Sequence, residues 1–186
     1  MTGRKFIESK IFHAWRTAIE VDYASQRINS ERSLQAAFWA HLNMSLPKTR
    51  RLFIEPTLIV RTPAGNRRIT PDIVICNTRE VISIIELKYL PRAAPRYDKD
   101  LDSLATIARE RRKISISNSR YRGPKGEPTE YSLSKSVLFV WAGVHADQGW
   151  EEKELFIGSR KVLKGSYLQL HAVTQHQENP KIFRVK

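Results

Sequence analysis

Cysteine is nearly absent from this sequence, and it contains no long apolar run. Cys76 is the single cysteine among 186 residues, so no internal disulfide can form, and no cluster of Cys and His has the spacing of a zinc site. No apolar stretch approaches the ~20 residues that a membrane helix requires, and the first residues, MTGRKFIESKIFHAWR, hold no continuous apolar signal segment. These absences predict a protein of the reducing cytoplasm.

The sequence also lacks internal repeats, low-complexity segments and the G-x-x-x-x-G-K-[ST] loop of nucleotide-hydrolysing motors. Its composition is that of an ordinary folded protein, with 41% hydrophobic and 27% charged residues. Because a chain of this length can bury a proper core, we expect one domain spanning residues 1–186.

Positive charge is in large excess. The chain has 32 Lys and Arg against 19 Asp and Glu, a formal net charge of +13. Such an excess favours polyanionic partners, above all nucleic acid. A basic surface that only keeps the protein soluble is the alternative, but the clustering of the positive residues favours nucleic acid.

Helical spacing of apolar residues predicts three helices. The first covers residues 5–24, and the third covers 98–113. Between them, Ser30 is a suitable N-cap for a second helix. The apolar stripe of this second helix consists of Leu34, Ala37, Phe38, His41 and Leu42.

Apolar runs separated by turn residues predict the strands. Three of them, 52–60, 67–75 and 81–89, are joined by short loops and should form an antiparallel meander. A buried strand follows at 136–144, and short strands, among them ELFIG at 154–158, are expected within 153–186. The predicted fold class is α/β, with a mixed sheet flanked by helices in the order α-β-β-β-α-β, after an N-terminal helix and before a C-terminal extension.

Three charged residues interrupt these apolar strands. Glu86 and Lys88 are two residues apart and therefore share one strand face, while Asp72 lies on the preceding strand. A tight hairpin would set the carboxylates of Asp72 and Glu86 side by side, where like charges raise each other's pKa. A divalent cation removes that repulsion, and hard oxygen ligands suit Mg²⁺ or Mn²⁺. Lys88 would then orient or deprotonate a water, or stabilise charge on a phosphate.

Pro71-Asp72 followed by Glu86-Leu87-Lys88 resembles the motif of the PD-(D/E)xK nuclease superfamily, whose members have the restriction-endonuclease-like fold. The predicted order of elements is also similar to that core over roughly residues 30–145. The resemblance implies that Asp72 and Glu86 bind the metal and that Lys88 is the catalytic lysine. Many members add a glutamate on the helix before the sheet, and Glu31 is the candidate here.

Plainer explanations remain open for each of these residues. Glu86 and Lys88 would simply pair at a strand end, and Asp72 would cap a turn. Glu31 would be a first-turn acid favoured by the helix dipole. Glu55, on the first strand, is either a further metal ligand or an edge residue.

A basic segment, residues 109–125, spans a helix end and a loop rich in Gly, Pro, Ser and Asn. It is expected to bind the phosphate backbone through Arg111, Arg112, Lys113, Arg120 and Arg122. Together these features predict an Mg²⁺-dependent endonuclease or exonuclease, with DNA favoured over RNA as substrate and a homodimer or a partner subunit left open. A non-catalytic nucleic-acid-binding module or structural subunit with the same fold is the alternative.

Overall fold

A computed structural model of the chain describes residues 3–110, 114–116, 131–146, 155–176 and 178–186. Within these ranges the α-helices are α1 (Gly3–Thr17), α2 (Glu31–Ser45) and α3 (Asp98–Arg109), and a π-helical turn η1 (Ala18–Tyr23) continues α1. A short 3₁₀ turn, η3, covers Lys161–Leu163. None of the helices in the described part of the chain is long and apolar enough to span a membrane.

A six-stranded mixed sheet forms the centre of the molecule, which confirms the predicted α/β class. Its order is β1-β4-β5-β7-β8-β9. The strands β5, β7 and β8 are parallel, whereas β1, β4 and β9 pair antiparallel with their neighbours. The strands cover Arg51–Ile54 (β1), Ile73–Cys76 (β4), Glu80–Leu90 (β5), Ser132–Ala146 (β7), Tyr167–Gln175 (β8) and Glu178–Val185 (β9).

The meander prediction was wrong in one respect, because two of its strands are broken. Residues 52–60 divide into β1 and β2 (Leu58–Thr62), and residues 67–75 divide into β3 (Gly65–Ile69) and β4. The β2 and β3 halves join β6 (Ile114–Ile116) in a separate three-stranded sheet. The predicted strand at ELFIG was also wrong, because residues 156–159 form a turn.

The two breaks lie opposite each other and have a common cause. Each contains a proline, Pro56 or Pro71, which lacks the N–H that a ladder requires. Glu55 turns the chain by adopting a positive φ of 47°, and its N–H donates to the carbonyl of Asp72 at 2.9 Å. A two-stranded ribbon therefore leaves the main sheet at one bend, and Asp72 lies at that bend rather than inside a strand.

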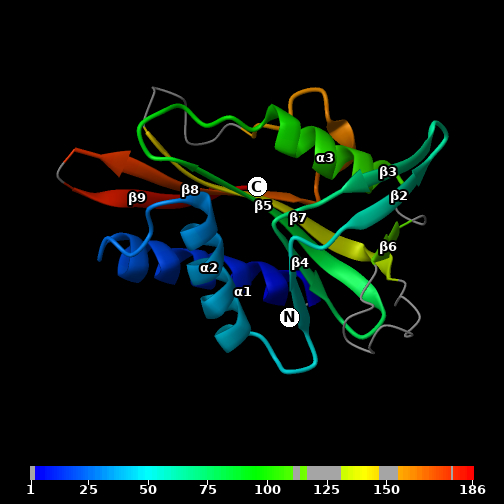
Figure 1. The fold of residues 1–186 in the computed structure, drawn as a ribbon, viewed down its shortest axis with the longest axis horizontal. Helices are drawn as coiled ribbons and strands as arrows, with labels where there is room; N and C mark the ends of the chain where they lie inside the picture. Colours follow the sequence, from blue (N-terminus) through cyan, green and yellow to red (C-terminus); the bar gives the residue numbers. More distant parts are fainter. Residues whose placement is uncertain (1–2, 111–113, 117–130, 147–154, 177) are drawn as a thin grey trace.

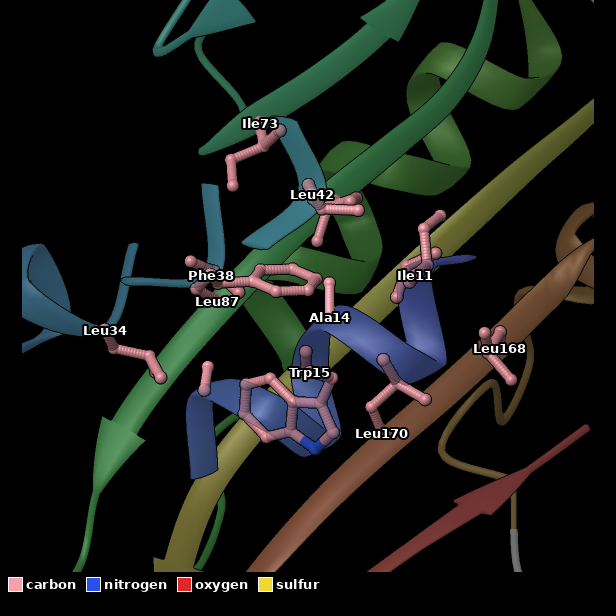
Figure 2. Close-up of a cluster of buried hydrophobic side chains, with 14 of the residues drawn as sticks. Ile11, Ala14, Trp15, Leu34, Phe38, Leu42, Ile73, Leu87, Leu168 and Leu170 are labelled. Carbon is pink, nitrogen blue, oxygen red and sulfur yellow. The ribbon is translucent and has the colours of Figure 1, made fainter. Parts of the chain in front are cut away.

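Helices cover both faces of the sheet (Figure 1). On one face, α1 and α2 bury Trp15 and Phe38, whose rings meet edge to face at 5.8 Å. Figure 2 shows Leu168 and Leu170 of β8 in the same cluster beside α1. Ser30 caps α2 as predicted and forms a capping box with Ser33. On the other face, α3 and the small sheet enclose a second core around Trp141.

The central strand β5 separates the two faces chemically. Ile85 and Leu87 belong to the core under α1 and α2. Glu86 and Lys88 alternate with them and therefore project from the opposite face, toward α3. All charged side chains of β5 near its carboxyl end thus face the α3 layer.

We predict that Gly143→Ala destabilises this α3 layer. A Cβ at position 143 would clash with the ring of Trp141, which is fully buried among core side chains. Overpacking of this kind costs about 1–3 kcal/mol in the free energy of unfolding. Thermal unfolding followed by circular dichroism measures the loss. Gly3→Ala is the control, because nothing lies within 4 Å of its new methyl group; equal melting temperatures for both variants would contradict the prediction.

Candidate active site

The ladder between β4 and β5 brings Asp72 and Glu86 together. Ile73 pairs with Ile85 in this antiparallel ladder, so one further step of the register sets Asp72 beside Glu86. The Oδ2 atom of Asp72 accepts a hydrogen bond from the N–H of Leu87 at 2.5 Å. This bond fixes the carboxylate of Asp72 against β5, next to the carboxylate of Glu86.

The backbone of Asp72 is fixed as firmly as its side chain. Its carbonyl oxygen accepts hydrogen bonds from Nε2 of Gln35, at 3.1 Å, and from the N–H of Glu55. Gln35 belongs to the buried face of α2, so this helix, the ribbon and β5 all hold the bend that carries Asp72.

Both acids resist ionisation. Burial raises the pKa of Glu86 well above its usual range, and the neighbouring carboxylates of Asp72 and Asp100 raise it further. Burial also raises the pKa of Asp72, to about 6, although the hydrogen bond from Leu87 acts in the opposite direction. Glu86 is only 8% exposed. No Lys, Arg or His in the described part of the chain forms an ion pair with either acid, so two carboxylates share this site without direct neutralisation.

Lys88 lies beside the two acids but pairs with other residues. Its Nζ atom is 3.4 Å from Oδ2 of Asp100 and 3.8 Å from Oε2 of Glu31. Partial burial lowers the pKa of Lys88, but the carboxylates of Asp100 and Glu31 outweigh burial, so the pKa lies above its ordinary value. Lys88 is therefore a cation at neutral pH, and it is not the simple ion-pair partner of Glu86.

Glu31 reaches the same place from α2. It lies in the first turn of that helix, and its Oε2 atom also accepts a hydrogen bond from the N–H of Tyr89 at 3.3 Å. The position suits the helix dipole and at the same time borders the acids of β5. Both explanations offered by the sequence for Glu31 therefore agree with its place in the structure.

Asp100, which was not predicted as a site residue from the sequence, is central to the cluster. Its side chain is 12% exposed and accepts a hydrogen bond from Nε1 of Trp141 at 3.3 Å. Burial raises the pKa of Asp100, partly offset by Lys88. One signal was available: Asp100 lies one helical turn before Leu104, on the apolar side of α3. The contact between Asp100 and Trp141, in contrast, could not be predicted from residue spacing, because the two residues lie on separate elements.

These side chains line a cleft of about 400 Å³. Acids from α2, the bend before β4, β5 and α3 lie together with Lys88 in its wall, namely Glu31, Asp72, Glu86 and Asp100. Cations from β3 and α3 complete the lining, namely Arg67, Arg68 and Lys99. The cleft thus combines a buried pair of carboxyl groups with exposed positive charge, an arrangement that suits a phosphate bridged to the protein by a cation.

Other residues named from the sequence lie elsewhere or outside the described ranges. Glu55 is exposed at the bend and does not belong to the lining of the cleft. The predicted phosphate-binding residues of the basic segment all fall outside the described ranges, namely Arg111, Arg112, Lys113, Arg120 and Arg122. The cations that the structure does place at the cleft are Arg67 and Arg68 of the β2–β3 hairpin, Lys88 of β5 and Lys99 of α3.

The donor set fits a hard divalent cation. Within the described ranges no three His, Cys, Asp or Glu side chains group closely enough to form a complete ligand set. Mg²⁺, however, keeps several of its waters and is commonly held by one or two carboxylates. Asp72 and Glu86 supply such a pair, and because burial disfavours their ionised forms and raises the pKa of each, a bound cation would stabilise those forms.

Two buried histidines form a separate polar cluster on the same side of the sheet. His145 of β7 and His171 of β8 are fully buried, with Nε2 of the first 2.9 Å from Nδ1 of the second. Burial, with a smaller effect of His145, lowers the pKa of His171 to about 3. His171 is therefore neutral at physiological pH, and neither histidine lines the cleft.

In comparisons with known proteins, no protein-family model, curated protein or solved structure matches the chain. Inference about function therefore depends on the geometry of the cleft.

We predict that Glu86→Gln stabilises the metal-free protein at alkaline pH. The folded-state pKa of Glu86 lies above the ordinary value of 4.5, so the folded protein retains a proton that the unfolded chain has already released. The wild type consequently loses stability as pH rises from about 4.5 through the folded pKa. Glutamine does not ionise, and the variant avoids this loss.

Melting temperatures in EDTA at pH 5 and pH 8 test this effect of Glu86. We expect Glu86→Gln to exceed the wild type by a larger margin at pH 8. Glu178→Gln makes the same change at an exposed position of β9 and should show no such margin. A Glu86→Gln variant that is less stable than the wild type at pH 8 would show that the carboxylate is not buried at a cost.

Proposed function

We propose that the protein is a metal-dependent nuclease that hydrolyses phosphodiester bonds in DNA. One observation carries the proposal: the carboxylates of Asp72 and Glu86 lie together, without an ion-pair partner in the described part of the chain, and Lys88 lies on the same strand face as Glu86. Structural charge pairs in a protein interior are ordinarily neutralised by each other. A cluster that is left short of positive charge, in a cleft rimmed by Arg67 and Arg68, is better explained by a ligand.

Asp72 and Glu86 are the residues that would hold Mg²⁺ or Mn²⁺. Once bound, the metal would polarise a phosphate oxygen and lower the pKa of a coordinated water. The remaining work falls to the side chains of the chain itself. Arg67, Arg68 and Lys99 attract the phosphate backbone into the cleft, and the buried floor of the cleft limits the water around the reacting bond.

Lys88 acts in this proposal as a charged hydrogen-bond donor. Its raised pKa keeps the ammonium group protonated, which favours stabilisation of negative charge on the phosphate over removal of a proton from water. Asp100 and Glu31 hold the ammonium from two sides, and Asp100 is itself held by Trp141. A positioned donor of this kind stabilises the transition state without rearranging as the charge develops.

The order of elements supports membership of the PD-(D/E)xK superfamily. From α2 onward, the order is α2, β1, β4, β5, α3 and β7, as expected for α-β-β-β-α-β, with the β2–β3 hairpin and the short strand β6 inserted. The antiparallel β1-β4-β5 unit is followed by a crossover through α3 to β7, which is parallel to β5. The motif residues lie at the bend before β4 and on β5, beside this crossover.

A non-catalytic nucleic-acid-binding module remains the second candidate, because the rim cations alone would bind a phosphate backbone. Two experiments separate it from an enzyme, one on metal binding and one on cleavage.

We expect the wild type to bind Mn²⁺ in isothermal titration calorimetry and Asp72→Asn to bind it at least tenfold more weakly. The asparagine retains an oxygen that can accept the Leu87 hydrogen bond, so the fold should persist while one anionic ligand is lost. Asp102→Asn is the matched control, because Asp102 is on α3 and pairs with Arg160, outside the cleft. Equal affinities of the wild type and Asp72→Asn would exclude the carboxylate pair as the metal site.

We expect Lys88→Ala to reduce DNA cleavage in Mg²⁺ by about a hundredfold or more, as the loss of one positioned electrostatic or acid–base group does. DNA affinity should change little, because the rim cations remain. Lys164→Ala removes an exposed lysine outside the cleft and should cut at the wild-type rate. A folded Lys88→Ala protein that cuts as fast as the wild type would refute the assignment, and a wild type that cuts no form of DNA would favour the binding module.

A further inference from the structure

A second hollow of about 650 Å³ adjoins the cleft. The two hollows share four lining residues, Glu31, Lys88, Lys99 and Asp100. The two hollows therefore adjoin, with the ion pairs of Lys88 between them, and we call them together the groove. We name them the hairpin half, which contains Arg67, Arg68 and Thr70, and the loop half, which contains Leu90, Pro95, Arg96 and Tyr97.

The hairpin half carries charge suited to a phosphate. Arg67 and Arg68 project from β3 and are exposed. Arg68 forms no ion pair or side-chain hydrogen bond with any described residue. Arg67 forms one long hydrogen bond, from its Nη1 to Oγ1 of Thr106 at 3.4 Å. Both guanidinium groups are thus available to an anion next to Asp72 and Glu86.

The loop half has a different chemistry, because one wall is apolar. Leu90, Pro95 and Tyr97 supply this wall, and the ring of Tyr97 is held rigid by stacking on Phe156 at 4.0 Å and 12°. Arg96 and Lys99 are exposed at the edge of the same hollow. An apolar wall beside cations matches a nucleotide, which has an apolar base face next to a charged phosphate.

We propose that the groove takes a single strand of DNA that continues through both halves, so that an internal phosphodiester bond lies over Asp72 and Glu86. A nucleotide on one side of that bond rests against Leu90, Pro95 and Tyr97, and the phosphate backbone on the other side is bound by Arg67 and Arg68. The inference rests on the proposed nuclease function and specifies its substrate.

Two properties of the groove favour this substrate. The apolar wall reaches a base only where the base is unstacked, and in a duplex the base faces are covered by their neighbours. In addition, the hollow that contains the two carboxylates continues past Lys88 into the loop half. If the site bound only the end of a DNA strand, one of the two halves would make no contact with the substrate.

Covalently closed DNA tests whether the bond is internal. The wild type is incubated in Mg²⁺ with circular single-stranded DNA, a linear single strand of the same sequence, and the circular duplex. We expect the single-stranded circle to be opened and the duplex circle to be cut at least tenfold more slowly. Digestion of the linear strand alone would overturn the inference and leave the nuclease function standing, as would equal cutting of both circles. Absence of cleavage on all three DNAs would count against the nuclease function and the inference together.

Charge reversal on each side of the groove tests whether both halves hold the strand. Arg68→Glu and Arg96→Glu are each introduced into Lys88→Ala, and binding of a single-stranded oligonucleotide is measured by fluorescence anisotropy at several salt concentrations. Arg79→Glu is the matched control, an exposed arginine in the turn before β5, outside both halves.

We expect both groove variants to bind roughly tenfold more weakly than the control, with the log–log salt slope reduced by about 0.7 for each lost phosphate contact on a single strand. The control should match its parent. If Arg96→Glu binds as the control does while Arg68→Glu is weakened, the strand occupies the hairpin half alone and the inference fails, whatever the wild type cuts.

Discussion

The hydrogen bond from the Leu87 N–H to the carboxylate of Asp72, at 2.5 Å, joins the two segments on which the whole site depends. It fastens the bend of the ribbon to the central strand of the sheet and so fixes the distance between two acids that repel each other. Without the ladder between β4 and β5, the carboxylates of Asp72 and Glu86 would separate and remain solvated. With it, the fold holds them close together and partly dehydrated, at a cost in stability.

The two hydrophobic cores on either side of β5 supply the stability that offsets this burial of the acids. Ile85 and Leu87 pack under α1 and α2, while Glu86 and Lys88 project into the α3 layer from the same strand. The α3 layer also supplies the order around Lys88, since Trp141 holds Asp100 and Asp100 holds the lysine. Gly143 leaves room for the ring of Trp141. Through Trp141 and Asp100, this buried glycine therefore contributes to the position of the Lys88 ammonium group in the groove.

The groove combines what the two sheets provide separately. The main sheet and its helices carry the acids, whereas the small sheet brings Arg67 and Arg68 to their edge. The bend connects β3 of the small sheet to β4 of the main sheet. The bend that positions Asp72 therefore also positions the two arginines. Acids that would hold a metal and cations that would hold a phosphate are thereby coupled through one short segment, residues 67–72.

Much of this arrangement could be predicted from local sequence. The cap at Ser30, the apolar stripe of α2, the central position of β5 and the shared face of Glu86 and Lys88 follow from spacing, because helices and strands repeat at fixed periods. The broken strands were harder to predict, because Pro56 and Pro71 are compatible with a bulge, an edge strand or a bend. The bend results from long-range pairing, in which β2 pairs with β6 and β4 pairs with β5. The contacts of Asp100 could not be predicted from the sequence, because its partners, Lys88 and Trp141, lie on two other elements, β5 and β7. Which residues carry charge, and on which face of each element they lie, therefore follows from local chemistry and period. Which of those charges meet depends on long-range pairing and packing, because these set the distances between elements.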